Sequence, residues 1–373
     1  MIKMSATTPN ITSNDKCSAT PSRRISWIDD AKMFAMLSVI AFHAIGYMSE
    51  KLAGRNDALN FIGTYNMQLF MFLAGYTSMK SLEKVTNWNT YWHYVVKIAL
   101  HLMLPTFAIG ILRALLTLDP AAIGNEQWFL KMLFRYLLVF ATVNLVFSAT
   151  GRRVKGNYLK GIINISRYAV FFLLMFVITK SKPSEFATFF LAAYLLRKHD
   201  VLEHISGSLP KATKTILAAA MFAIGLATVW STYGVSSAHS FYGESFYVLM
   251  QNRQADIFLC RQLCGMGWVT IFTLIFILMS RHYTRFSLWG SKSLGLYIIH
   301  TFFMRLTLDR ITFTCEDTLI GWSLIAGIVT AYTALSLITI SLLEKNRFTN
   351  FLFLGAGLST LKNNTNRTDN NQQ

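Results

Sequence analysis

Long apolar stretches alternate with short polar segments through most of the chain. The apolar stretches cover residues 31–48, 60–79, 92–116, 127–148, 164–180, 184–197, 212–232, 257–280, 288–308 and 318–343. Most of them approach or exceed the roughly 20 residues that an α-helix needs to cross a bilayer. The pattern therefore predicts an all-α, polytopic membrane protein with about ten transmembrane helices. The two shortest stretches, 164–180 and 184–197, could instead form one hairpin.

Polar segments flank this apolar region at both ends. Residues 1–22 are rich in Ser, Thr and Asn, a composition that predicts a disordered cytoplasmic N-terminal segment. They lack the charged start and short apolar core of a secretory signal, so we expect the first apolar stretch to be retained. Residues 346–373 are predicted to form a polar cytoplasmic tail, and residues 23–345 a single membrane domain.

Basic residues are distributed unevenly between the predicted loops. With the N-terminus placed in the cytoplasm, the loops and termini on that side receive most of the Lys and Arg residues, among them Lys80, Arg152 and Lys198. Cytoplasmic loops of membrane proteins carry such an excess of positive charge. The asymmetry favours an even number of spans with both termini in the cytoplasm.

The large positive net charge has to be interpreted together with the composition of the chain. The chain has 373 residues, of which 53% are hydrophobic and 14% charged, whereas a soluble domain carries roughly 25% charged residues. The formal net charge of +17 would suggest a nucleic-acid partner in a soluble protein. Here the basic residues lie in short loops, and no nucleic-acid-binding module is present. We therefore predict a lipid bilayer as the surroundings and no nucleic-acid partner.

The first apolar stretch carries two ionisable residues. Lys32 and His43 are eleven positions apart, which is about three helical turns and returns to the same face, roughly 16 Å along the axis. Taken singly, Lys32 could snorkel to the headgroups and His43 could be a packing residue. Together they indicate a polar path, because an ionisable group inside a span is costly and usually functional. Asp29 and Asp30 are expected to cap the start of this helix.

Other predicted spans also carry polar groups. His300, Arg261 and His101 lie within three of them, although His300 could serve a helix–helix hydrogen bond instead. So many intramembrane polar residues predict a cavity that holds them. The sequence contains no zinc-type His/Cys cluster and no G-x-S-x-G elbow, so we expect neither a metal nor a bound cofactor nor an acyl-serine.

Three motifs resemble those of the acyltransferase 3 family, in particular its branch related to fucose 4-O-acetylases. The first is Trp27-Ile-Asp-Asp-Ala-Lys32, followed after ten intervening positions by His43. The second is Asn66-Met-Gln-Leu-Phe-Met-Phe-Leu-Ala-Gly-Tyr76, and the third is Ser291-Lys-Ser-Leu-Gly-Leu-Tyr-Ile-Ile-His300. Together they extend from residue 24 to about residue 305.

The second motif departs from the family pattern. Asn66 and Gln68 stand where relatives usually have His and Pro, and Ala74 replaces a Ser before the glycine. His101 occupies a position where relatives commonly carry Arg. These changes fall on the expected substrate pocket and leave His43 intact.

The resemblance implies a membrane O-acyltransferase in the inner or plasma membrane of the cell. Such an enzyme transfers an acetyl or other short acyl group from acyl-CoA to a hydroxyl of a surface glycan or lipid-linked saccharide. His43 would be the catalytic base, because an imidazole exchanges protons near neutral pH, and Lys32 would act with it by holding the anionic part of the donor. The candidate substrate-binding residues are His300, Arg261, His101 and Asn66.

Two other functions remain open. The intramembrane charges could line the route of a transporter that exports a glycan intermediate, although the two related halves typical of many transporters are not visible. The altered second motif could also mark a degenerate family member that keeps the fold without catalysis.

Overall fold

The structure is a computed structural model that describes residues 25–121, 127–154, 156–178, 185–207, 210–238, 249, 252–279, 283–309, 311, 313 and 317–355. Within these ranges the chain is helical and contains no β-strand, which confirms the all-α prediction. The predicted segment 1–22 lies outside the described residues. The helices are α1 (Ser26–Gly46), α2 (Arg55–Gly63), α3 (Asn66–Leu82), α4 (Trp88–Ile98), the π-helix η1 (Ala99–Met103), α5 (Leu104–Thr117), α7 (Trp128–Arg153), α8 (Asn157–Ile178), α9 (Ala187–Lys198), α10 (Val201–Gly207), α11 (Lys211–Ala238), α13 (Ala255–Met279), α14 (Arg285–Gly290), α15 (Ser293–Thr307), α16 (Thr318–Leu343) and α17 (Arg347–Leu354).

Six helical segments of the described chain are long and apolar enough to cross a membrane. They are Trp88–Thr117, Trp128–Arg152, Asn157–Phe176, Ala212–Ser237, Ala255–Met279 and Thr318–Leu343. They support a multi-pass membrane protein. The larger count of about ten stays a prediction, because the helices α3, α9 and α15 in the remaining stretches are shorter than the usual span.

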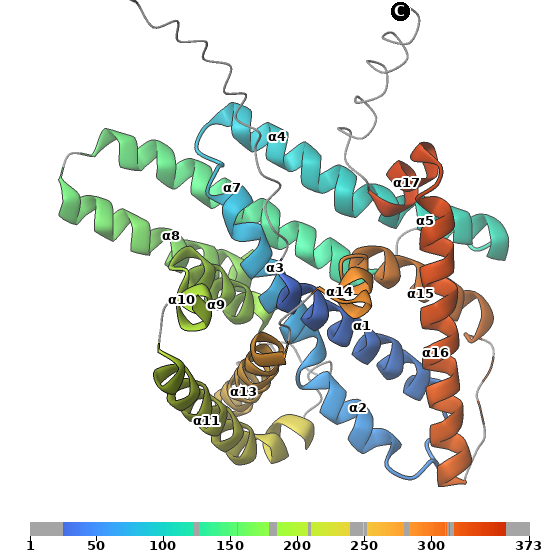
Figure 1. Ribbon diagram of the computed structural model, residues 1–373. Helices are drawn as coiled ribbons and strands as arrows, with labels where there is room; N and C mark the ends of the chain where they lie inside the picture. Colours follow the sequence, from blue (N-terminus) through green and yellow to red (C-terminus); the bar gives the residue numbers. More distant parts are fainter. Residues whose placement is uncertain are drawn as a thin grey trace, which may run out of the picture.

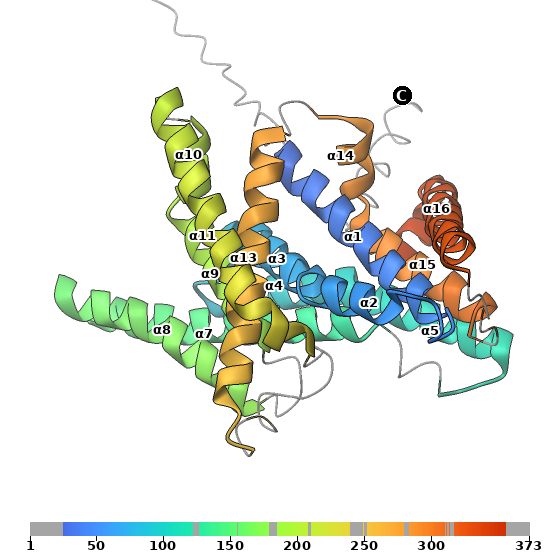
Figure 2. The same cartoon turned by 90° about the horizontal axis from the view of Figure 1, so that it is seen from below.

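Helix α1 crosses the middle of the molecule. In Figures 1 and 2 it lies between α14 and α15 on one side and α2 and α3 on the other. Helices α11 and α13 pack against each other as a pair, while α8 packs along α7, which also contacts α3, α4 and η1. The candidate base His43 therefore lies near the end of a central helix rather than on the periphery.

Three predicted spans are interrupted in the structure. Stretch 60–79 is divided between α2 and α3, and stretch 288–308 between α14 and α15. Stretch 92–116 continues through a π-helical turn at η1, directly before Pro105. Proline has no N–H to bond the carbonyl four residues earlier, here that of His101, and its ring clashes with it. A wider turn accommodates that clash, and such turns frequently occur at functional sites.

Residues from the ends of three helices meet around the carboxylate of Glu83. Glu83, just beyond α3, accepts hydrogen bonds from Arg167 of α8 at 3.1 Å and Lys198 of α9 at 2.8 Å, and a short one from Tyr194. Burial raises the pKa of the Glu83 carboxyl, but these hydrogen bonds and the nearby charges outweigh it, so the net pKa lies below its ordinary value. Basic residues of α8 and α9 thus lie together at the end of α3.

The predicted C-terminal tail begins with an ordered helix. Residues 347–354 form α17, which packs against α5 and α16. Gly355 ends it with φ +65°, a backbone conformation that favours glycine. The rest of the predicted tail, from residue 356 onward, lies outside the described residues.

Gly75 brings α3 and α9 into backbone contact. A Cβ atom at Gly75 would lie 2.2 Å from the carbonyl oxygen of Phe190. We predict that Gly75→Ala lowers stability by about 1–3 kcal/mol, since overpacking a close contact forces the backbones apart. The apparent Tm in detergent measures this loss.

Gly327 provides the matched control. It also lies within a helix, but nothing stands within 4 Å of its Cβ position. Gly327→Ala should raise stability by roughly 0.5–1 kcal/mol through the better helix propensity of alanine. Equal Tm values for the two variants would contradict the close packing of α3 on α9.

Candidate functional site

The first turns of α1 are joined to α14 by their acidic residues. The Ser287 hydroxyl donates to Asp30 at 2.6 Å, and the Tyr283 hydroxyl donates to Asp29 at 3.4 Å. Helix α1 begins at Ser26 without a side-chain cap. The expectation that Asp29 and Asp30 cap the helix was therefore wrong, because both carboxylates are engaged in tertiary contacts with Ser287 and Tyr283.

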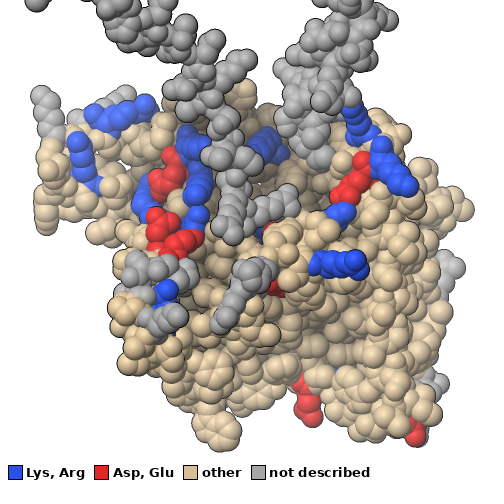
Figure 3. All heavy atoms as spheres, viewed as in Figure 1, with Lys and Arg blue, Asp and Glu red and all other residues tan. Residues whose placement is uncertain are grey.

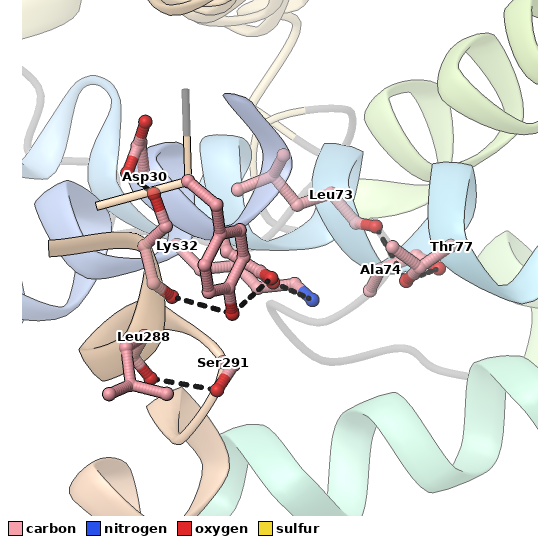
Figure 4. A network of polar contacts seen from close by, with 10 residues as sticks. Asp30, Lys32, Leu73, Ala74, Thr77, Leu288 and Ser291 are labelled. Atoms are coloured by element: carbon pink, nitrogen blue, oxygen red, sulfur yellow. Dashed lines mark hydrogen bonds and ion pairs between the residues drawn. The ribbon is translucent and has the colours of Figure 1, made fainter. Parts of the chain in front are cut away.

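Lys32 lines the larger of the two cavities at α1. Its ammonium group lies 3.4 Å from Asp29, and Figure 4 shows the side chain extending toward α3, where Ala74 and Thr77 lie. The cavity, of about 250 Å³, is hereafter the Lys32 cavity. Its polar lining consists of Lys32, Thr77, Ser78, His101, Ser293 and Tyr297. A single cation in a mainly apolar chamber suits an amphipathic anion.

His101 projects into the same cavity from η1. Its Nδ1 lies 2.8 Å from the carbonyl oxygen of Gly355, and because a carbonyl only accepts, Nδ1 carries the hydrogen. A Cβ atom at Gly355 would lie 2.5 Å from the His101 carbonyl oxygen. The backbone after α17 thus holds the His101 ring in place, and the structure brings together two residues that the sequence proposed separately, Lys32 and His101.

His43 lines a second, smaller cavity at the opposite end of α1. This His43 cavity has a volume of about 120 Å³, and its other lining residues are Tyr47, Thr301, Met304, Arg305 and Asp309. The His43 side chain is half-buried. Its ring lies 5.8 Å from the His300 ring, centroid to centroid. The two candidate histidines, far apart in sequence, are therefore neighbours.

Asp309 organises the charges around the His43 cavity. Its carboxylate accepts a hydrogen bond from the Tyr47 hydroxyl at 2.8 Å and forms ion pairs with Arg113 at 3.3 Å and Arg305 at 4.0 Å. Two guanidinium groups thus share one carboxylate. The cavity carries donors for a polar ligand beside the imidazole of His43.

His300 is fully buried, and its own helix fixes its orientation. Its Nδ1 donates to the Leu296 carbonyl at 2.7 Å. The Thr301 hydroxyl lies 3.4 Å from Nε2, but its hydrogen is donated to the Tyr297 carbonyl at 2.6 Å. The bond to Leu296 leaves Nε2 without a hydrogen in the neutral ring. His300 does not line the cavity and instead packs against His43.

Two predicted substrate-binding residues lie away from both cavities. Arg261 of α13 forms an ion pair with Glu185 at 3.4 Å, and neither side chain is exposed to solvent. Asn66, at the start of α3, is 1% exposed and accepts a hydrogen bond from the Met67 N–H at 2.6 Å. Neither residue belongs to the lining of the Lys32 or the His43 cavity.

The sequence reasoning missed three residues with a place in this arrangement. Tyr47 follows His43 by four positions and so shares its helix face, and Asp309 follows Arg305 by four; this spacing was a usable signal. Glu185 carried no comparable signal, because its partner Arg261 lies 76 positions away.

The arrangement is suited to acid–base chemistry. Within the described ranges, no three His, Cys, Asp or Glu side chains converge in a way that could hold a metal ion. An accessible imidazole lies beside guanidinium donors at one end of α1, and a lysine lies in an apolar cavity at the other. Such a helical membrane protein fits a membrane acyltransferase, in which a base and charge-stabilising donors suffice.

Comparison with known families agrees with this class. Residues 25–345 match the acyltransferase 3 model, described as an acyltransferase domain. The chain therefore belongs to the acyltransferase 3 family. No curated protein and no solved structure matches the chain.

The buried pair provides a test of the role predicted for Arg261. Arg261→Met should lower stability by about 3–5 kcal/mol, because it leaves the Glu185 carboxylate buried without its counter-ion. The double variant Arg261→Met, Glu185→Met should recover most of the loss. Apparent Tm values of the four proteins form the cycle. A single variant with unchanged Tm and lost acyl transfer would instead make Arg261 a substrate-binding residue.

Proposed function

We propose that this acyltransferase moves an acetyl or other short acyl group from acyl-CoA to a hydroxyl of a cell-surface glycan or its lipid-linked precursor, with His43 as general base. The observation that carries the proposal is the half-buried imidazole of His43, which lines a cavity beside Arg305 and Asp309. Membership of the acyltransferase 3 family indicates acyl transfer. The cavity contains a candidate base and has space for a hydroxyl group.

The reaction needs one base and no covalent enzyme intermediate. The unprotonated ring nitrogen of His43 takes the proton of the acceptor hydroxyl, while the hydroxyl oxygen attacks the thioester carbonyl carbon. The C–S bond then breaks, and the leaving CoA thiolate takes the proton back from His43. A positioned base of this kind contributes about 10²–10⁴-fold to the rate.

His300 acts as a positioning residue in this scheme. Its ring packs against His43 at 5.8 Å, and its Nδ1 hydrogen bond to the Leu296 carbonyl holds it in one orientation. A rigid neighbour limits the rotamers available to the His43 ring. Pre-organisation of this kind keeps a base within reach of its proton.

The candidate donors for negative charge are Arg305, which lines the His43 cavity, and Arg113, which pairs with the lining residue Asp309. Both share the Asp309 carboxylate. Cationic donors that face a developing oxyanion stabilise it more in a water-poor site than in water. We assign them to acceptor binding or to oxyanion stabilisation in the proposed reaction.

Lys32 is proposed to hold an anionic part of the donor. It is the cation of the Lys32 cavity, whose remaining lining is largely apolar, and a lysine offers a point charge that suits a phosphate. The roughly 16 Å between Lys32 and His43 along the helix excludes direct cooperation. The extended pantetheine arm of acyl-CoA is the part of the donor that would bridge this distance.

His43→Ala is the central test of the proposed base. We expect acetyl transfer to the surface glycan to fall by about 10²–10⁴-fold, because the acceptor hydroxyl loses its base. Acetyl-CoA-dependent transfer in membranes measures this, with the amount of inserted protein determined in parallel. His93→Ala, on an exposed face of α4, is the matched control and should keep full activity.

The same assay separates the proposal from its rivals. A wild-type protein without any acyl transfer would indicate a transporter or a degenerate member. Wild-type transfer rates in His43→Ala would remove His43 as the base.

Lys32→Met should act mainly on donor binding. We expect a KM for acyl-CoA raised by about tenfold, with a smaller change in kcat, because the lost cation contacts a part of the donor that does not react. The exposed Lys80→Met on α3 is the control with equal loss of charge. A fall in kcat with unchanged KM would place Lys32 at the reacting atoms instead.

A further inference from the structure

A third cavity lies between the facing ends of α7 and α8, apart from the two described above. It has a volume of about 410 Å³ and is hereafter the basic pocket. Its polar lining consists of Thr86, Ser148, Arg152, Lys160, Asn164 and Arg167. Three of these side chains are cations, and none of the described lining residues is a carboxylate. It shares no lining residue with the Lys32 or the His43 cavity.

The cations of the basic pocket carry excess positive charge. One Arg152 nitrogen donates to the Thr86 carbonyl at 2.9 Å, which holds the guanidinium in place. Arg152 and Lys160 take part in no ion pair among the described residues. Arg167 pairs with Glu83, which also binds Lys198. A single carboxylate is therefore shared by Arg167 and Lys198, and the pocket's other two cations, Arg152 and Lys160, have no ion-pair partner in the described part of the chain.

Arg167 adds an unsatisfied donor to the wall. Its side chain is 7% exposed, and its Nε atom is buried without a hydrogen-bond partner within the described part of the chain. A buried N–H without a partner costs about 1–3 kcal/mol.

The surface beside the basic pocket is apolar. Leu159, Ile162 and Ile165 of α8 are exposed, Ile165 to 71%, and Val146 of α7 is also exposed. In a membrane protein such faces contact acyl chains. Figure 3 shows Lys and Arg side chains gathered over the upper part of the molecule, which includes α7 and α8, above a largely uncharged surface.

We propose that the basic pocket binds the phosphate group of an anionic phospholipid, whose acyl chains lie along the exposed apolar faces of α7 and α8. Basic pockets between transmembrane helices on the cytoplasmic side bind such headgroups. The loop that joins α7 and α8 is predicted to be cytoplasmic from its charge. The lipid contacts both helices, and the site is independent of the acyl transfer proposed above.

A lipid is favoured over a soluble phosphate because the pocket opens beside lipid-facing residues rather than beside the Lys32 cavity. The phosphate chemistry is the same for both sources. The ring of three cations suits a phosphate diester or monoester better than a carboxylate-only ligand, since arginine and lysine supply many donors around one centre.

Titration of the full-length protein in micelles with phosphatidylglycerol tests this proposal, with phosphatidylcholine as the neutral lipid and native mass spectrometry as the readout. Wild type should bind phosphatidylglycerol more tightly than phosphatidylcholine. The double variant Arg152→Gln, Lys160→Gln should bind it roughly 30-fold more weakly, about fivefold for each charge removed. If that variant fails to fold, Lys160→Gln alone should still show about a fivefold loss.

Lys80→Gln, Lys345→Gln is the matched control, since it removes two exposed basic residues outside the pocket. It should keep the wild-type preference, and an equal loss in this control would overturn the proposal in favour of general surface charge. Competition with inorganic phosphate and with CoA distinguishes the sources. Displacement of the lipid by either one at comparable concentration would make the pocket a soluble-phosphate or donor site and overturn the lipid assignment.

Discussion

The backbone contact between α1 and α14 is the constraint on which the candidate site depends. A Cβ atom at Gly290 would lie 1.7 Å from the carbonyl oxygen of Asp29, so only glycine lets the two helices touch here. The hydrogen bond from Ser287 to Asp30 closes the same contact. Because α15 begins three residues after Gly290, this contact determines where α15 runs along α1. The pairing of the His43 and His300 rings at the far end follows from it.

The fold could be predicted where hydropathy alone determines an element. The predicted span 318–343 coincides with α16 residue for residue. Span 92–116 shows the limit, because hydropathy measures transfer into lipid and is insensitive to how an apolar helix is wound. The π-helical turn there arises from Pro105, whose ring excludes a bond to the His101 carbonyl. Pro105 indicates in the sequence where the helix is disturbed. Whether a wider turn forms there depends on the packing around the proline.

The candidate site could be predicted as far as it lies on one helix. Spacing alone predicted that Lys32 and His43 share a face of α1, and in the structure each lines a separate cavity. Contacts between distant segments could not be predicted, because one sequence does not show which polar residues come together in the fold. Arg261 shows this: a buried arginine in a span suggested a ligand, whereas its observed partner is Glu185. A buried charge pairs with a counter-ion where the fold provides one, because an unpaired charge is costly to bury.

The separation of the two cavities has a physical reason in a membrane. Tyr297 lines the Lys32 cavity, and its ring meets the His300 ring edge-on at 5.7 Å, with His43 beyond. A continuous polar channel from Lys32 to His43 would conduct protons and small solutes. The rings of Tyr297, His300 and His43, which meet edge-on and at a tilt, would interrupt such a channel. In the proposed reaction the pantetheine arm with its acyl group has to pass Tyr297, while the charged donor head and the polar acceptor stay at opposite ends of α1.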